Sequence, residues 1–238
     1  MPMPPAKKPP TMVWMRDRTT KTRPVVTEEK IVRTAIAIAD AEGLDALSMR
    51  RLAAEMGTGT TSLYRHVAGK DELFELMVDT IIGEEPLPEP GDDWRAELAQ
   101  LARRQRAVML LHPWLAQQAA RHPTLGPNVI ARADHHLGIV SRMTGDPTLA
   151  TMVVDTINTH VLGAVSAELA ELEVQRRTGM TEDEWRNWVG AYVRQVVESG
   201  RYPHFNRRVL EADDVDPATR FEFGLECLLT GIEAALRG

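Results

Sequence analysis

The chain has 238 residues, of which 43% are hydrophobic and 26% are charged, the composition of an ordinary globular protein of one or two domains. No apolar run approaches the roughly 18 residues that a membrane span needs, and the Pro- and Lys-rich start lacks the apolar centre of a secretory signal. We therefore expect no membrane partner. The single cysteine, Cys227, excludes an intrachain disulfide and fits a reducing cytoplasm, and its helical neighbourhood predicts a buried, inert thiol.

The net charge of −6 argues against DNA binding over the whole surface, but the charge is divided along the chain. Residues 1–70 carry a net +5, and the remaining residues carry a net −11. A basic N-terminal part on an acidic body would direct DNA to one end of the molecule.

Helical signals begin only after residue 24. Residues 1–24 contain six Pro and six Lys or Arg without periodicity, which predicts a disordered basic extension, either a simple leader or an arm that contacts phosphates or the minor groove. Thr27 then provides an N-cap, and Gly43 is expected to end the first helix. The inward face of that helix consists of Ile31, Ala35, Ile38 and Ala39.

Residues 48–67 predict two short helices joined by a tight turn. Ser48 is a suitable N-cap, and Gly57 supplies the left-handed residue that ends the first of them. Leu63 and Val67, four residues apart, face inward and leave the polar side chains around them outside. The apolar stripe of the first helix consists of Met49, Leu52, Ala53 and Met56. This pattern is typical of a helix-turn-helix. A helical hairpin in a larger bundle is the alternative, but its outer face would be richer in Glu and Lys.

The rest of the chain also reads as helical. Residues 73–81 mark a fourth helix, and the three prolines within 84–91 predict a boundary between a DNA-binding domain, 25–85, and a second domain, 92–238. Further helix starts are expected at Asp93, at Asp146 and Asp216 (each followed by Pro), and at a capping box from Thr181 to Glu184. No alternating strand and no repeat is found. We expect an all-α protein with roughly nine or ten helices.

Two helices in the second domain, about 147–177 and 217–237, have apolar residues over too wide a surface for one contact face. Burial in the interior and burial in a dimer interface explain this pattern equally well.

Common enzyme and metal motifs are absent from the sequence. Residues 57–60 lack the Lys of a phosphate-binding loop, and there is no HExxH, CxxC or GxSxG. His135 and His136 are adjacent and point in different directions on a helix, so they form a poor chelate. His160 shares a helix face with Glu168, but a buried or capping role is the simpler interpretation. We expect no enzyme activity, no metal site and no cofactor.

The residues Ser48, Leu52, Ala53, Gly57, Ser62–Val67 and Lys70–Leu73 resemble the DNA-binding domain of the tetracycline-repressor (TetR) family over about residues 27–75. The remainder resembles that family's C-terminal domain more weakly, through His112–Trp114, Pro123–Pro127 and Val161–Gly163. The resemblance implies an N-terminal helix-turn-helix domain and a C-terminal helical domain for ligand binding and dimerisation. It also implies a homodimeric repressor that a small-molecule inducer releases from a palindromic operator in double-stranded DNA. A constitutive DNA-binding protein and an all-α enzyme are the alternatives.

The resemblance assigns Arg50 to a base contact, which suits the bidentate pairing of Arg with guanine. The expected DNA-binding residues are Ser48, Arg50, Thr60, Thr61, Ser62, Tyr64, Arg65, His66 and Lys70, of which Tyr64, His66 and Lys70 would contact phosphates. Members of the family pair two helices per subunit in a four-helix interface. The expected dimerisation residues are Val154, Ile157, Val161, Phe221, Leu225, Leu228 and Ile232.

A Met- and Trp-rich second domain favours an adaptable apolar ligand site. Its expected walls are Trp94, Leu101, Met109, Trp114, Met143, Met152 and His160, for each of which ordinary core is the alternative. By rough alignment, Pro86, Leu101 and Gln118 take the places where the tetracycline repressor has ligands of its drug–magnesium chelate. This difference predicts a largely apolar inducer that needs no magnesium.

Overall fold

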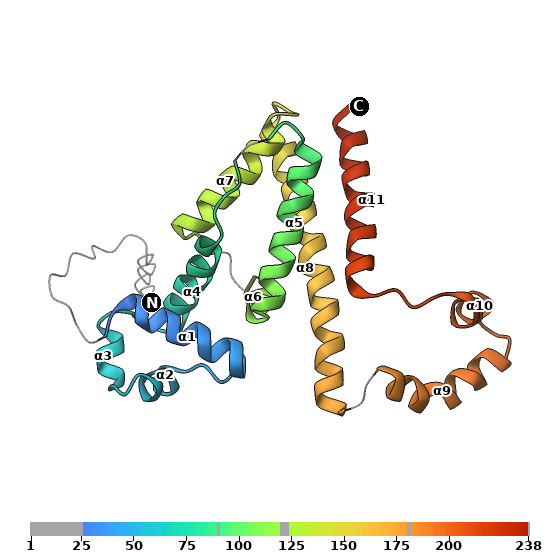
Figure 1. Cartoon of the computed structure of the whole chain (residues 1–238), viewed down its shortest axis with the longest axis horizontal. Coiled ribbons are helices and arrows are strands. Elements are labelled where there is room, and N and C mark those ends of the chain that lie inside the picture. The colour runs from blue at the N-terminus through green and yellow to red at the C-terminus, as the bar shows by residue number, and fades with distance from the viewer. Residues whose placement is uncertain (1–25, 90, 120–123, 180–181, 238) are drawn as a thin grey trace, which may run out of the picture. The chain divides into compact units, whose positions relative to one another are not determined.

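The computed structural model describes residues 26–89, 91–119, 124–179 and 182–237, and over these ranges it contains helices and no strand. The all-α prediction is confirmed (Figure 1). There are eleven helices in these ranges, against the nine or ten expected, because elements as short as α6 and α10 are too brief for a periodicity argument. The helices are α1 (Glu28–Glu42), α2 (Met49–Glu55), α3 (Thr60–Tyr64), α4 (Lys70–Glu84), α5 (Trp94–Leu111), α6 (Trp114–Ala119), α7 (Pro127–Ser141), α8 (Pro147–Thr178), α9 (Glu182–Glu198), α10 (Pro203–Glu211) and α11 (Pro217–Arg237).

The helix starts follow the predicted caps. Side-chain oxygens accept backbone N–H groups of the first turn in α1, α2, α5, α8 and α11, and the accepting residues are Thr27, Ser48, Asp93, Asp146 and Asp216. Gly43 ends α1 with a φ of 82°, in the left-handed region that favours glycine, as predicted. The expected cap at Thr181 and the N-terminal extension 1–24 lie outside the described residues.

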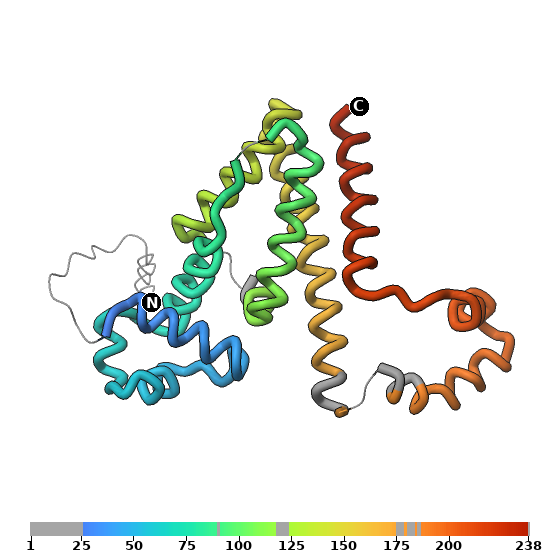
Figure 2. The backbone as a smooth tube through the Cα atoms, in the orientation of Figure 1, coloured from blue at the N-terminus to red at the C-terminus, as the bar shows by residue number. Residues whose placement is uncertain are grey.

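The described residues separate into two compact units, those within 26–97 and 111–145 and those within 98–110 and 146–237. In the first unit, α1 packs on α2 and α4, α2 packs on α3, and α4 packs along α7, as the tube in Figure 2 shows. The core of this unit includes Ile31, Leu52, Leu63 and Met77, all fully buried. The packing ties the short helices α2 and α3, which would not be stable alone, to the longer α1 and α4.

In the second unit, α8 packs along α11, and Val161, Val165, Leu225 and Leu229 are buried. The helices α9 and α10 contact each other, and α10 buries none of its side chains. None of the helices in the described ranges is long and apolar enough to cross a membrane.

The prediction that Cys227 is buried is wrong, because the thiol lies on the exposed side of α11. The apolar side chains of that helix, Phe221, Leu225, Leu229 and Ile232, turn to the opposite, buried side. Helical spacing places position 227 away from that stripe.

Candidate DNA-binding surface and ligand-binding region

The predicted helix-turn-helix is formed by α2, a turn through residues 56–59 and α3. Gly57 has a φ of 62°, so the turn uses the left-handed residue that the sequence predicts. Leu52, Leu63 and Val67 are each 0% exposed and fix both helices on the core of the first unit. The side chains between these anchors must therefore point outward.

The expected DNA-binding residues all remain at the surface of the chain. The exposed ones are Ser48, Arg50, Thr61, Tyr64, Arg65 and Lys70, and the half-buried ones are Thr60, Ser62 and His66. Tyr64 is 53% exposed although it is a large aromatic residue. An exposed surface of arginine, hydroxyl and tyrosine side chains at the start of a short helix is suited to phosphate and base contacts.

Two neighbouring arginines of α2 differ in their surroundings. Arg51 donates to Glu55 Oε2 at 2.6 Å and to Glu42 Oε1 at 2.7 Å, and these bonds, first to Glu42 and then to Glu55, raise the pKa of its guanidinium. Arg50 is exposed and makes no hydrogen bond or ion pair with the part of the chain that the structure describes. Arg51 therefore braces α2 against α1, whereas the guanidinium of Arg50 is free for an external acceptor.

Lys70 is held more loosely at the first turn of α4. Its Nζ lies 3.5 Å from the Leu44 carbonyl oxygen and 5.2 Å from the centre of the Phe74 ring. Neither contact neutralises the charge. The hydroxyl oxygen of Ser48 accepts the Arg51 N–H at 3.1 Å, and its own proton remains available to a phosphate oxygen.

Trp114, one of the expected ligand-site residues, joins α6 to α1. It is 2% exposed, and its Nε1–H donates to Asp40 Oδ1 at 2.7 Å. His112 Nδ1 lies 2.8 Å from the same oxygen. The three residues form a polar joint between α1 and the start of α6. We refer to Asp40, His112 and Trp114 as the α1–α6 joint.

The paired histidines of α7 are a feature that sequence reasoning considered only as a metal chelate. The Nε2 atoms of His135 and His136 are buried and make no hydrogen bond within the described ranges. Burial, followed by the charges of Arg132 and His135, lowers the pKa of His136 to about 4 from its ordinary 6.5, so the ring is neutral at pH 7. A buried, unsatisfied ring nitrogen is unusual enough in a folded protein to suggest a role. The signal available in the sequence was the adjacent pair of histidines itself.

No cluster of three or more His, Cys, Asp or Glu that could hold a metal ion occurs among residues whose placement is described.

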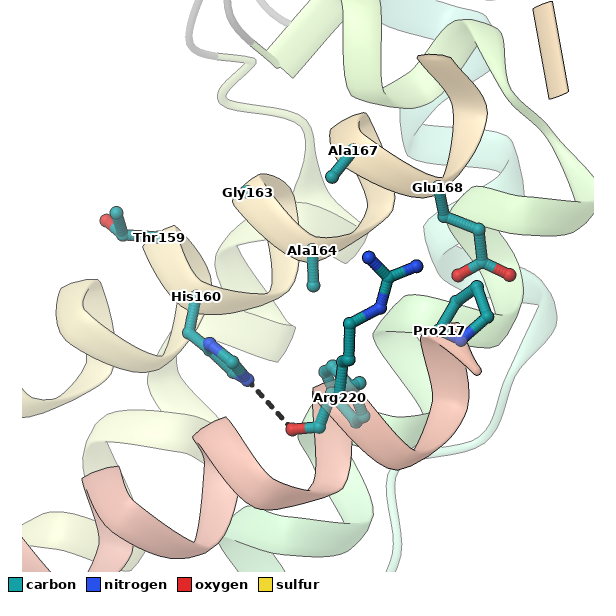
Figure 3. A pocket seen from close by; sticks show the side chains of 9 residues that line it. Thr159, His160, Gly163, Ala164, Ala167, Glu168, Pro217 and Arg220 are labelled. Carbon is teal, nitrogen blue, oxygen red and sulfur yellow. Dashed lines mark hydrogen bonds between the residues drawn. The ribbon is translucent and has the colours of Figure 1, made fainter. Parts of the chain in front are cut away.

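A cavity of about 340 Å³ lies between α8 and the start of α11 (Figure 3). His160 stacks on Phe221 with 5.2 Å between ring centres and donates through Nε2 to the Phe221 carbonyl oxygen at 3.1 Å. Arg106 reaches the same ring from α5 and pairs with Glu168 at 2.7 Å. The lining residues are Thr159, His160, Gly163, Ala164, Ala167, Glu168, Pro217, Arg220 and Phe221.

A second, wider groove of about 540 Å³ continues along α8 and shares Thr159 and His160 with the first. It is also lined by Met152, which is 60% exposed, and by Leu228 of α11. Thus Met152 and His160 line a cavity as expected. The other expected ligand residues line neither of these two cavities, namely Trp94, Leu101, Met109, Trp114 and Met143. Of these, Leu101 and Trp114 are buried core.

Most of the expected dimerisation residues are buried within one chain, where α8 packs on α11. These are Ile157, Val161, Phe221, Leu225 and Ile232. Of the two explanations that the sequence leaves open, burial in the interior accounts for these residues, since each helix covers the apolar stripe of the other. Only Val154 and Leu228 are half-exposed. The most exposed apolar side chain on these helices is Phe223, at 73%.

Known proteins resemble both the N-terminal and the C-terminal part of the chain. The pattern of a family described as bacterial regulatory proteins, tetR family, matches residues 31–77. The pattern of the tetracyclin repressor-like C-terminal domain matches residues 87–236. Among relatives, the HTH-type transcriptional repressor DrrR1 of Streptomyces coeruleorubidus is 41% identical over 218 residues, which cover 89% of this chain and 78% of the relative.

Solved structures give the same result. Apo ActR from Streptomyces coelicolor superposes with a TM-score of 0.76 at 30% identity, covering 90% of this chain and 98% of ActR. ActR in complex with actinorhodin superposes with a TM-score of 0.74 at 32% identity, covering 89% of this chain and 98% of ActR. The similarity extends over both the DNA-binding part and the C-terminal part.

Proposed function

This chain belongs to the tetR family of bacterial transcriptional regulators, and we propose that it is a homodimeric repressor that a small, largely apolar inducer releases from a palindromic operator. The observation that carries the DNA-binding half of this proposal is the difference between Arg50 and Arg51. One guanidinium is committed to two carboxylates within the chain, and its neighbour is exposed and free. Arg50 is the base-reading residue in this proposal.

The two arginines also provide the experiment. A double-stranded operator is recovered by selection from the source genome, and its affinity is measured by fluorescence anisotropy at fixed salt. Arg50→Ala is expected to lose about 1–3 kcal/mol of operator binding and to relax base preference at one position of each half-site. Arg51→Ala, the matched control, should lower stability while leaving the base preference unchanged. If Arg51→Ala changed the preference and Arg50→Ala did not, the assignment would be reversed.

A homodimer is supported by the exposed apolar residues of α8 and α11. Met152, which is exposed, and Leu228, which is half-exposed, line the wider groove, and the exposed Phe223 lies earlier on α11. We propose that a second copy covers this surface through the same helices, with the α3 helices of the two copies roughly one DNA turn apart. Leu228→Glu is expected to give monomers of about 26.5 kDa in sedimentation at micromolar concentration. A wild-type protein of that mass would overturn the proposal.

The inducer is proposed to contact α7 through His136. The Nε2 atom of His136 is buried and unpaired within the described ranges, and the ring is neutral at pH 7, so this nitrogen can form the hydrogen bond that fixes the orientation of an organic ligand. The complex of the related ActR with actinorhodin supports an organic ligand. Because the expected magnesium ligands are absent at Pro86 and Leu101, release from the operator should not depend on a metal ion.

The test is operator release by actinorhodin, and by tetracycline with magnesium, each with and without EDTA. Release by an organic probe should survive EDTA, and His136→Phe should raise the probe concentration needed at least about fivefold without changing operator affinity. His204→Phe, at an exposed histidine of α10, is the control. Release that required magnesium, or that was unaffected by His136→Phe, would contradict the ligand assignment.

A further inference from the structure

A buried carboxylate lies in the middle of α4, the helix that follows the helix-turn-helix. Asp79 is 5% exposed, although the neighbouring inward residues Met77 and Ile81 are apolar. A charged group is retained in such a place only if hydrogen bonds compensate its lost hydration. The partners of Asp79 all belong to α7, about fifty residues further along the chain.

The carboxylate of Asp79 caps α7. Its Oδ1 accepts the backbone N–H groups of Asn128 at 2.9 Å and Val129 at 3.1 Å. The first turn of α7 has no cap of its own, because its N-cap residue is Gly126 and Pro127 has no N–H. The side chain that α7 needs at its N-terminus is therefore supplied by another helix, where a negative charge is also favoured by the helix dipole.

A side chain of α7 in turn caps the C-terminal end of α4. Arg132 Nη2 donates to the carbonyl oxygens of Ile82 at 2.8 Å and Glu85 at 3.2 Å, where α4 ends without internal partners. Asn128 Nδ2 completes the set by donating to Asp79 Oδ2 at 2.9 Å and to the Asp79 carbonyl oxygen at 3.1 Å. We refer to Asp79, Asn128 and Arg132 as the α4–α7 clamp.

Two glycines make the close approach possible. A Cβ added at Gly126 would lie 2.7 Å from Asp79 Cβ and closer still to its carboxylate. A Cβ added at Gly83 would lie 2.7 Å from Asn128 Cγ. Gly138, also on α7, has open space around the same position. The α4–α7 clamp therefore requires glycine at both positions, because a Cβ at either one would collide with a side chain of the clamp.

We propose that the α4–α7 clamp couples the conformation of α7 to that of the helix-turn-helix, with Asp79, Asn128 and Arg132 as positioning residues. Directional hydrogen bonds hold one arrangement of two helices, whereas apolar contacts alone permit sliding. Arg132 lies one helical turn before His136, so a ligand at His136 is next to one end of the clamp. This last step rests on the function proposed above.

The coupling through the α4–α7 clamp is tested with operator DNA alone, on the full chain. Amide hydrogen exchange over residues 124–141 is measured with and without the selected operator duplex. In wild type and in Gly138→Ala, operator binding is expected to slow exchange at Asn128 and Val129 about fivefold or more. In Gly126→Ala, exchange there should be the same with and without DNA, although the protein still binds the duplex.

The outcomes separate the two proposals. A wild type that binds no duplex contradicts the proposed function. The proposed coupling is overturned if the wild type binds the duplex without any change of hydrogen exchange at Asn128 and Val129, or if Gly126→Ala keeps that change. The α4–α7 clamp would then be only a structural cap. If Gly126→Ala fails to fold, Gly83→Ala decides, because it displaces only the end of the Asn128 side chain. Gly83→Ala should reduce the slowing of hydrogen exchange on operator binding, and an undiminished slowing overturns the proposed coupling.

Discussion

The contacts of the α1–α6 joint predict how much Trp114→Phe destabilises the folded chain. The substitution removes the indole N–H that donates to Asp40 at 2.7 Å, and it removes part of a ring that is 2% exposed. A hydrogen bond to a charged group contributes about 1.5–3 kcal/mol. The lower end applies here, because the Asp40 side chain is 30% exposed and water replaces part of the loss. The ring carbons that are lost add about 0.8 kcal/mol for each buried CH₂ equivalent.

Together these losses predict that Trp114→Phe lowers the free energy of unfolding by about 3 kcal/mol and the thermal midpoint by about 6–12 °C. Far-UV circular dichroism is the suitable signal, since it does not depend on the tryptophan that is removed. Trp94→Phe is the control, because that half-exposed indole makes no hydrogen bond within the described ranges. In a double-mutant cycle with Asp40→Ala, the coupling energy should be about 1–2 kcal/mol. Coupling near zero would refute the joint, whatever the single variants did.

Three further outcomes are expected. Lys70→Ala should weaken binding to all DNA sequences alike and reduce the salt slope by about one unit, as lost phosphate contacts do; a changed sequence preference in anisotropy titrations would contradict this role. Leu63→Ala should cost about 2–5 kcal/mol of stability in urea, since Leu63 is fully buried, whereas the exposed Tyr64→Ala should cost under about 0.5 kcal/mol while weakening the operator complex. The pKa of His136, about 4 when folded and 6.5 when unfolded, means that the unfolded chain takes up the proton first, so stability is complete above pH 6.5 and declines toward pH 4 by up to about 3 kcal/mol. His136→Gln should remove that decline, and an unchanged pH profile of urea unfolding would show that another group is responsible.

The helix-turn-helix is largely determined by the sequence itself. The N-caps at Thr27 and Ser48, the left-handed Gly57 and the inward pair Leu63 and Val67 all appear in the structure as predicted. Each of these signals acts within one or two helical turns, where backbone conformation and side-chain spacing are fixed by neighbours along the chain. The exposed polar face of α2 and α3 follows from them.

Only the tertiary structure decided the contacts of side chains whose partners are distant in sequence. Sequence spacing does not distinguish Arg50 from Arg51, because one of the carboxylates that hold Arg51 comes from α1. The sequence gives no sign that Trp114 bonds to Asp40, 74 residues away. Asp79 acquires its role only when α7 lies beside α4.

The apolar stripes of α8 and α11 illustrate the same limit. Periodicity identified both stripes, but it does not state whether their cover comes from the same chain or from a second copy. Packing of α8 on α11 covers Val161 and Leu225 and turns Cys227 and Phe223 outward. A hydrophobic pattern records that a face is buried and carries no information about which surface buries it, because the hydrophobic effect is non-directional and depends only on the area removed from water.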